Sequence, residues 1–178
     1  MDEIVKAALA KWPDVPACRG WLGLDARAQW YLRDEAAQAA GGFPESRGSL
    51  IEHPGLREFI QRNYAADDDG AWFFQNGPQR VYVELEAAPL ILRLTRRDDA
   101  AVAIETHCGS VVECKAVLSD EWGRVFIATE LGLGLVHSLD MGIVADQVES
   151  GGWDVEMVPH AGLPQRFGFV RSPAAAAS

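Results

Sequence analysis

The chain has 178 residues, of which 16 are basic and 26 acidic, so its formal net charge at pH 7 is −10. Hydrophobic residues make up 48% and charged residues 24%, a composition typical of one globular domain or two small subdomains, which excludes a disordered chain. An acidic chain repels phosphate backbones and anionic lipid, which argues against nucleic-acid or membrane-surface binding as its main function.

The N-terminus lacks the pattern of a signal peptide. Asp2 and Glu3 stand where such a peptide carries Lys or Arg, and the apolar run at 4–9 is too short for its hydrophobic region. No apolar stretch approaches the ~20 residues of a membrane-spanning helix. Three cysteines are an odd number and too few for a secreted disulfide scaffold. We therefore expect a cytoplasmic protein with reduced thiols.

The first third of the chain alternates helical and strand patterns. Acidic residues begin a first helix and Pro13 ends it, whereas Pro54 takes the preferred first position of a second helix, in which apolar residues recur at helical spacing. In chain order, the patterns predict a helix at 2–11, strands at 21–24 and 30–32, a partly flexible loop at 36–48 and a helix at 54–64.

Strand patterns dominate the rest of the chain. Apolar and polar residues alternate over 81–86, as in a sheet with one face in water. The terminal stretch at 172–178 has nothing to bury, so we expect a frayed tail there. The remaining expected elements are strands at 72–75, 81–85, 90–94, 102–106, 111–118, 125–129 and 153–158, and a helix at 139–149.

One eight-residue pattern occurs three times, at 25–32, 67–74 and 120–127. It consists of Asp, two variable residues, Gly or Ala, a spacer and three large residues that favour strands. The Asp side chain can accept hydrogen bonds from backbone N–H groups of its own turn, and Gly supplies the positive φ that closes a bulged hairpin. Ala28 replaces this Gly in the first copy, which costs roughly 1 kcal/mol if the same turn forms. The pattern predicts three similar hairpins.

Together these patterns predict an α+β fold that is rich in antiparallel strands and built from repeated hairpin and helix motifs. The six Trp and seven Phe residues are many for two small cores, so some of them could form an interface in a homo-oligomer. We expect an N-terminal helix and loop at 1–17, a hairpin–helix–strand subdomain at 18–86, a strand-rich subdomain at 87–170 and a disordered tail at 171–178.

The order of these motifs resembles an uncharacterised proteobacterial domain-of-unknown-function family of about this length. The resemblance covers roughly residues 20–130, and its motifs are Trp-Tyr-Leu at 30–32, Leu-Ile at 50–51, the helix at 56–64, Asp-Gly-Ala-Trp-Phe-Phe at 69–74 and Gln-Arg-Val-Tyr-Val-Glu at 79–84. It implies a small α+β protein of two subdomains with repeated motifs, for which a part in signal transduction has been suggested. Residues 76–79 (Asn-Gly-Pro-Gln) depart from the family, which has a threonine–proline–acid run there.

The segment with the most candidate binding residues lies at 72–84. Our functional interpretation makes Arg80 the binding group, since its planar fork can hold a carboxylate or a phosphate. In the alternative, Arg80 pairs with Glu84 or a nearby carboxylate and the aromatic residues are core. In the first interpretation the rim of the pocket is Asn76, Gln79 and Arg80, and its floor is Trp72, Phe74 and Tyr82. His137 is a further ligand-binding candidate, and the sequence leaves open whether it shares a cavity with Arg80.

Three other groups of residues suggest catalysis, and each has a simpler structural interpretation. Residues 137–140 (His-Ser-Leu-Asp) contain the residue types of a hydrolase triad, but neighbours in sequence rarely reach triad geometry, and a helix cap is the alternative. His107 could activate Cys108 as a nucleophile, although a free Cys in a strand is usually a small buried hydrophobe. Glu84 and Glu86 share a strand face, where paired carboxylates can act as acid and base or simply be solvated.

A metal centre is not expected. The spacing of Cys108 and Cys114 differs from that of a zinc site, and the other ligands would have to come from Cys18 or a distant His. The aspartates at 67–69 resemble the start of a calcium loop but lack its glutamate at the twelfth position, so turn capping explains them better.

Two functional hypotheses follow. The first is a non-catalytic cytoplasmic module, without cofactor, that binds a small molecule or a protein partner in regulation or signal transduction. The second is a small hydrolase or transferase that uses His137 or the His107/Cys108 pair. An unreactive Cys108 would argue against the second hypothesis.

Overall fold

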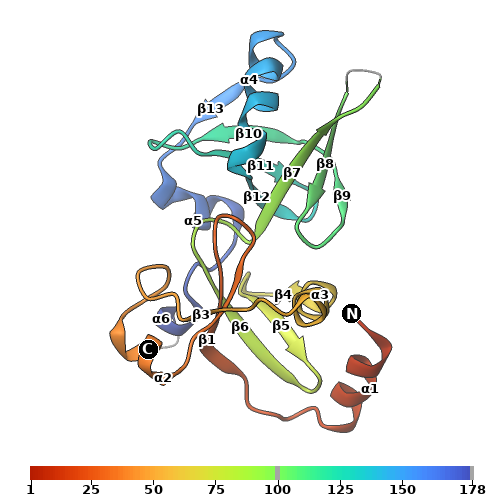
Figure 1. Ribbon diagram of the computed structural model, residues 1–178, viewed down its shortest axis with the longest axis vertical. Helices are drawn as coiled ribbons and strands as arrows, with labels where there is room; N and C mark the ends of the chain where they lie inside the picture. Colours follow the sequence, from red (N-terminus) through yellow and green to blue (C-terminus); the bar gives the residue numbers. More distant parts are fainter. Residues whose placement is uncertain (99–100, 177–178) are drawn as a thin grey trace. The chain divides into compact units, whose positions relative to one another are not determined.

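The computed structural model describes residues 1–98 and 101–176 and has an α+β fold (Figure 1). The chain divides into two compact units. Unit 1 consists of Met1–Asp25, Gln29–Ala87 and the C-terminal segment from Gly168 onward, and unit 2 consists of Ala26–Ala28 and Ala88–Phe167. The N-terminal helix and the C-terminal segment therefore belong to unit 1 instead of forming separate pieces of the chain.

Unit 1 contains a six-stranded sheet with the strand order β3-β2-β1-β6-β5-β4. Strands β1 and β6 run parallel, and the other neighbouring strands are antiparallel. The sheet thus consists of two three-stranded meanders joined along one parallel pair. Its strands are β1 (Cys18–Leu24), β2 (Trp30–Leu32), β3 (Ser49–Leu50), β4 (Tyr64–Ala66), β5 (Trp72–Asn76) and β6 (Gln79–Leu85).

Unit 2 repeats this topology in a seven-stranded sheet, β13-β10-β11-β12-β7-β8-β9. Strands β7 and β12 form the parallel pair between two antiparallel meanders, and β13 adds in parallel outside β10. Hairpin β4–β5 therefore corresponds to hairpin β10–β11. The strands are β7 (Leu90–Arg96), β8 (Val102–Thr106), β9 (Val111–Val112), β10 (Ala116–Ser119), β11 (Val125–Thr129), β12 (Gly132–Val136) and β13 (Val155–Met157).

The helices are short, and some of them begin at a residue whose side chain caps the first turn. His53 caps α3, since its Nδ1 accepts a hydrogen bond from Leu56 N at 3.2 Å, and Pro54 takes the first turn as predicted. The helices are α1 (Glu3–Lys11), α2 (Glu35–Ala40), α3 (Pro54–Arg62), α4 (Met141–Glu149), α5 (Leu163–Phe167) and α6 (Pro173–Ala176), with 3₁₀ turns η1 (Ser138–Asp140) and η2 (His160–Gly162).

The segment that we expected to be a flexible loop, 36–48, is held by a buried arginine. The guanidinium of Arg33 donates to the carbonyl oxygens of Gly41 at 2.6 Å, Ser46 at 3.0 Å and Gly20 at 3.1 Å. Asp34 in addition caps α2 at its start. The prediction was wrong because these carbonyls find their donors in one side chain rather than in water.

The C-terminal segment is also ordered, up to the last described residue. Val170 N donates to Gly70 O at 3.0 Å, and Leu85 N donates to the carbonyl of Arg171 at 2.8 Å. The prediction of a disordered tail from residue 171 was therefore wrong over 171–176, because these backbone bonds tie the segment to unit 1. Residues 177–178 lie outside the described residues.

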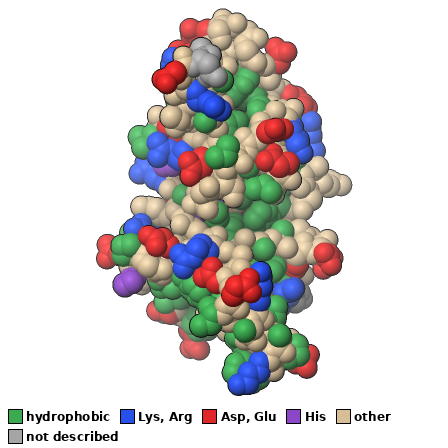
Figure 2. Space-filling view, turned by 90° about the vertical axis from the view of Figure 1, so that its right-hand side faces the viewer, with side chains coloured by type: hydrophobic (Ala, Val, Ile, Leu, Met, Phe, Trp, Pro, Cys, Tyr) green, Lys and Arg blue, Asp and Glu red, His purple; other side chains and the backbone are tan. Residues whose placement is uncertain are grey.

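Charged side chains of both signs occur on the surface. On the face drawn in Figure 2, Lys and Arg side chains lie among Asp and Glu side chains, so this face has no large patch of one sign. Across the described ranges, 1–98 and 101–176, no helix combines the length and the apolar character needed to cross a membrane.

Candidate functional site

The three copies of the sequence pattern form the same turn, as predicted. In each copy, Oδ1 of the Asp accepts a hydrogen bond from the backbone N–H four residues later, at 2.8 Å for Asp25, 2.9 Å for Asp67 and 2.9 Å for Asp120. The third residue after each Asp has a positive φ, 63° at Ala28, 79° at Gly70 and 74° at Gly123. Ala28 therefore adopts the left-handed conformation that Gly adopts in the other two copies.

A fourth turn of this kind was missed because a hydroxyl replaces the carboxylate. Thr106 Oγ1 accepts a hydrogen bond from Ser110 N at 3.1 Å, and Gly109 has φ 84°. A search for Thr as well as Asp before x-x-Gly would have found it. Cys108 lies in this turn and not, as expected, in a strand.

The second carboxylate oxygen of each Asp binds a side chain. Oδ2 of Asp25 accepts from Arg47 at 3.0 Å, and Oδ2 of Asp120 accepts from Arg124 Nε at 2.7 Å. Oδ2 of Asp67 accepts from the hydroxyl of Tyr82 at 2.9 Å. Each Asp thus closes its own turn and at the same time positions a second group.

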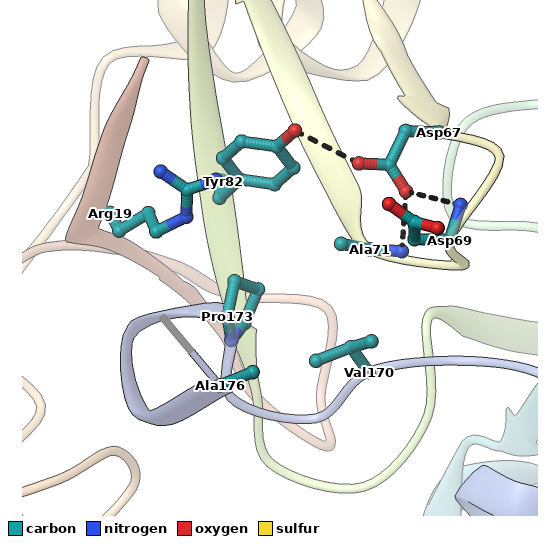
Figure 3. A pocket seen from close by; sticks show the side chains of 8 residues that line it. All are labelled: Arg19, Asp67, Asp69, Ala71, Tyr82, Val170, Pro173 and Ala176. Carbon is teal, nitrogen blue, oxygen red and sulfur yellow. Dashed lines mark hydrogen bonds between the residues drawn. The ribbon is translucent and has the colours of Figure 1, made fainter. Parts of the chain in front are cut away.

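A pocket of about 330 Å³ lies beside the Asp67 turn in unit 1 (Figure 3). Strand β1 supplies one wall, β6 and the β4–β5 turn supply two others, and the C-terminal segment supplies the last. The lining residues are Arg19, Asp67, Asp69, Ala71, Tyr82, Val170, Pro173 and Ala176.

The pocket holds opposite charges at its two ends. The Arg19 guanidinium stacks on the ring of Tyr82, 4.6 Å from the ring centroid. Figure 3 shows Arg19 on one side of Tyr82, with Asp67 and Asp69 on the other. Within the described part of the chain, neither Arg19 nor Asp69 forms a side-chain ion pair or hydrogen bond. These two charged groups are thus available to a molecule in the pocket.

The strand register separates the residues that we expected to form one pocket floor. Phe73 faces Tyr82 across the β5–β6 pair, and Phe74 faces Val81. Because side chains alternate along a strand, Trp72 and Phe74 lie on the sheet face opposite Tyr82. The predicted floor was wrong for these two residues, and of its three members Tyr82 alone lines the pocket.

The three predicted rim residues have other contacts. Arg80 stacks on Phe73 at 4.6 Å, and within the described ranges it does not form the ion pair with Glu84 or a nearby carboxylate that the alternative interpretation had proposed. Gln79 Nε2 donates to the carbonyl of Pro16 at 3.0 Å. Asn76 ends β5 before Gly77, whose φ of 57° followed by a proline suits a type II′ hairpin turn. None of the three lines the pocket of Figure 3.

Arg19 is the main residue that the sequence analysis missed. It lies before the point at which the apolar pattern predicted the strand to begin. The expected strand began at Trp21, whereas β1 begins at Cys18. An arginine that precedes a Gly-aromatic pair at the start of a strand is the available signal, and it is weak.

The His-Ser-Leu-Asp segment does not form a triad. His137 lies in unit 2, where its Nδ1 accepts from Leu139 N at 3.2 Å and caps η1. Asp140 binds Arg93 through both oxygens, at 2.6 Å and 3.1 Å, and accepts from Leu94 N at 3.0 Å. Burial raises the pKa of Asp140, but the hydrogen bonds from Arg93 and Leu94 outweigh it and lower that pKa overall.

The His107/Cys108 pair has the wrong proton arrangement for a nucleophile and its base. His107 Nδ1 accepts from Ile91 N at 3.2 Å, so in the neutral ring the proton is on Nε2, the atom 3.5 Å from Cys108 Sγ. Burial lowers the pKa of His107 to about 4 and raises the pKa of Cys108 to about 12. The imidazole therefore cannot take the thiol proton, and the thiol stays protonated at neutral pH.

Glu84 in β6 and Glu86 directly after this strand also have structural partners. Glu84 is buried and accepts from Ser172 Oγ at 2.5 Å and from Ala174 N at 3.0 Å. Glu86 pairs with Arg47 at 3.1 Å. No group of three or more His, Cys, Asp or Glu side chains suited to a metal ion occurs among residues 1–98 and 101–176.

The sequence matches the DUF2944 family model, described as "Protein of unknown function (DUF2946)", over residues 1–174. The chain belongs to this family. This confirms the resemblance to an uncharacterised domain-of-unknown-function family. Among curated proteins, none matches the chain.

Two solved structures of DUF1285 family proteins resemble this DUF2944 member. The protein from Silicibacter pomeroyi DSS-3 has a TM-score of 0.51 and 11% identity, over 82% of this chain and 84% of that chain. The protein from Shewanella baltica OS155 has a TM-score of 0.48 and 18% identity, over 71% of this chain and 91% of that chain. At 11% identity, the first likeness shows a shared fold alone.

The pocket of this DUF2944 member combines polar groups with an apolar wall. Arg19 offers several N–H donors in a plane, and Asp69 offers acceptors. The other wall is apolar and consists of Val170, Pro173 and Ala176. Such a combination of a few oriented polar groups and apolar walls is typical of small-molecule sites.

Proposed function

We propose that unit 1 is a non-catalytic module that binds a small ligand in the pocket beside the Asp67 turn. One observation carries the proposal: Arg19 and Asp69 line a pocket of about 330 Å³, and neither forms an ion pair within the described ranges. The pocket lies within the size range of ligand sites. A guanidinium and a carboxylate that face one cavity can each gain a charge-assisted hydrogen bond from a ligand.

The far wall of the pocket is held by specific bonds. Glu84 accepts the hydroxyl of Ser172 and the N–H of Ala174, which flank the lining residue Pro173. Val170, the neighbouring wall residue, is tied to Gly70 through its backbone N–H. A pre-formed wall reduces the ordering cost of binding, as expected for a ligand site.

Binding without chemistry suits a regulatory or signalling role. We place the module in the cytoplasm, where the free thiols of Cys18, Cys108 and Cys114 remain reduced. The alternative, a hydrolase or transferase, lacks an activated nucleophile at either of the places where the sequence suggested one.

The proposal is tested by fragment screening of the full chain with two-dimensional NMR. Fragments should shift the signals of the pocket residues. Ala176→Phe adds an aromatic ring to the pocket wall and should abolish these shifts. Ala175→Phe is the matched control, since Ala175 is exposed on the same helix and does not line the pocket. The proposal is wrong if no fragment shifts the pocket signals, or if both variants respond as the wild type does.

A further inference from the structure

The two charges of the pocket indicate which class of molecule it accepts. We propose that the ligand is a zwitterion whose carboxylate or phosphate binds Arg19 and whose ammonium group binds Asp69. This inference rests on the proposed function.

At the anionic end of the ligand, the arginine is oriented by its stack on Tyr82. The Tyr82 side chain is 7% exposed, its hydroxyl donates to Asp67, and its ring contacts Phe73 edge-on at 6.0 Å. A guanidinium stacked on a ring keeps its N–H edge free to form two parallel hydrogen bonds. Arg19 thus presents a fork that matches a carboxylate or a phosphate.

At the cationic end, Asp69 is the available acceptor. Both oxygens of Asp67 are already used, Oδ1 by the N–H groups of Asp69 at 3.1 Å and Ala71 at 2.9 Å, and Oδ2 by Tyr82. The first of these bonds also fixes the backbone of Asp69.

The placement of Arg19 and Asp69 on different sides of Tyr82 favours ligands whose two charges are separated. Arg19 lies over the ring of Tyr82, whereas Asp69 lies beside Asp67, which holds the hydroxyl end of that ring (Figure 3). A ligand that reaches both groups must therefore carry its two charges at separate ends, with Tyr82 between them. Val170 and Pro173 offer an apolar surface to the part of the ligand between its charges.

Calorimetric titration with ω-amino acids of increasing length tests whether the ligand is a zwitterion. The probes are glycine, 4-aminobutanoate and 6-aminohexanoate, with 6-acetamidohexanoate lacking the cation and hexylamine lacking the anion. We expect one of the two longer zwitterions to bind at least about tenfold more tightly than glycine and than both single-charge controls, since each charge-assisted hydrogen bond is worth about a factor of ten.

Two pairs of variants test the residues. Arg19→Gln and Asp69→Asn should each weaken binding of the preferred zwitterion about tenfold. Their controls, Arg80→Gln and Asp68→Asn, remove the same charges from exposed residues that do not line the pocket, and should leave affinity unchanged. Arg19→Glu should reverse the preference, so that 1,5-diaminopentane binds more tightly than the zwitterion. Thermal melts verify that each variant is folded.

The outcomes separate this inference from the proposed function. If NMR fragments bind at the pocket but the single-charge compounds match the zwitterions, or no amino acid binds, the zwitterion class is wrong and the binding module stands. Equal losses in the pocket variants and their controls would refute the assignment of Arg19 and Asp69. If nothing binds at the pocket in either experiment, both proposals fail.

Discussion

The repeated Asp turn allows one substitution to be compared at three equivalent positions. Ala28, Gly70 and Gly123 all have φ between 63° and 79°, a conformation that costs a non-glycine residue about 1–2 kcal/mol. The surroundings differ. A Cβ at Gly123 would meet nothing within 4 Å, whereas a Cβ at Gly70 would lie 2.1 Å from the carbonyl oxygen of Gly168.

Three different changes in the free energy of unfolding are therefore expected. Ala28→Gly relieves the strained φ but adds freedom to the unfolded chain, for a net gain of roughly 0.5–1 kcal/mol. Gly123→Ala introduces the strained φ and reduces the freedom of the unfolded chain, so it should cost roughly 0.5–1 kcal/mol. Gly70→Ala adds a backbone clash, so its cost should exceed about 2 kcal/mol.

Urea denaturation followed by circular dichroism measures these differences by linear extrapolation. For a chain of this size, 1 kcal/mol corresponds to a shift of roughly 2–4 °C in Tm, which provides a second measurement. Gly70→Ala should also expose the C-terminal segment, because Val170 N bonds to the carbonyl of Gly70. Hydrogen exchange at Val170 would show this as faster exchange than in Gly123→Ala.

Two results would refute the reasoning. A destabilised Ala28→Gly would mean that the left-handed conformation at this position is not strained. Equal costs for Gly70→Ala and Gly123→Ala would mean that the close approach of the C-terminal segment to Gly70 does not constrain the turn.

Three further predictions concern buried groups. The folded-state pKa of His107, about 4, lies below its usual value, so the stability that neutral His107 contributes is present above pH 6.5 and is lost as the pH falls towards 4. Urea titrations over this range should show a loss on the order of 2–3 kcal/mol that His107→Asn lacks, and identical pH profiles would contradict it. Cys108, with a pKa of about 12, should react with iodoacetamide at pH 8 at least about a hundredfold more slowly than in urea, with the exposed Cys114 as internal reference, and rapid labelling of native Cys108 would restore the nucleophile hypothesis. Glu84→Gln removes an acceptor of the Ser172 hydroxyl and should speed amide exchange in the C-terminal segment about fivefold or more, whereas unchanged exchange would show that Glu84 does not hold the pocket wall.

The turns could be predicted from the sequence because all their determinants are local. An Asp side chain and the N–H group that it binds are four residues apart, and the left-handed position lies between them. Helix α3 was predicted for the same reason, since its cap, its proline and its apolar spacing are contained in eleven residues. The Thr106 turn was missed although it is equally local, because the pattern was defined by a carboxylate.

The pocket could not be predicted, because its residues come from segments that are far apart in the sequence. Tyr82 was a candidate because of its residue type and its place in a dense segment. Its partners Arg19 and Asp67 are brought next to it by the parallel pairing of β1 with β6 and by the β4–β5 turn. The predicted floor combined Trp72 and Phe74 from one face of the sheet with Tyr82 from the other, because the register that pairs Phe73 with Tyr82 is a tertiary property.

The C-terminal segment shows the same limit. Its alanines carry no signal for order, and they are held by Glu84, 90 residues from Ala174, whose buried carboxylate requires donors. The residue types and short-range patterns of the sequence determined the fold class of the protein and the chemistry of its turns, because both depend on composition and on bonds between near neighbours. Which charges share a cavity was decided only by the tertiary structure, because strand pairing brings together Arg19 and Asp69 and removes Arg80 from the same site.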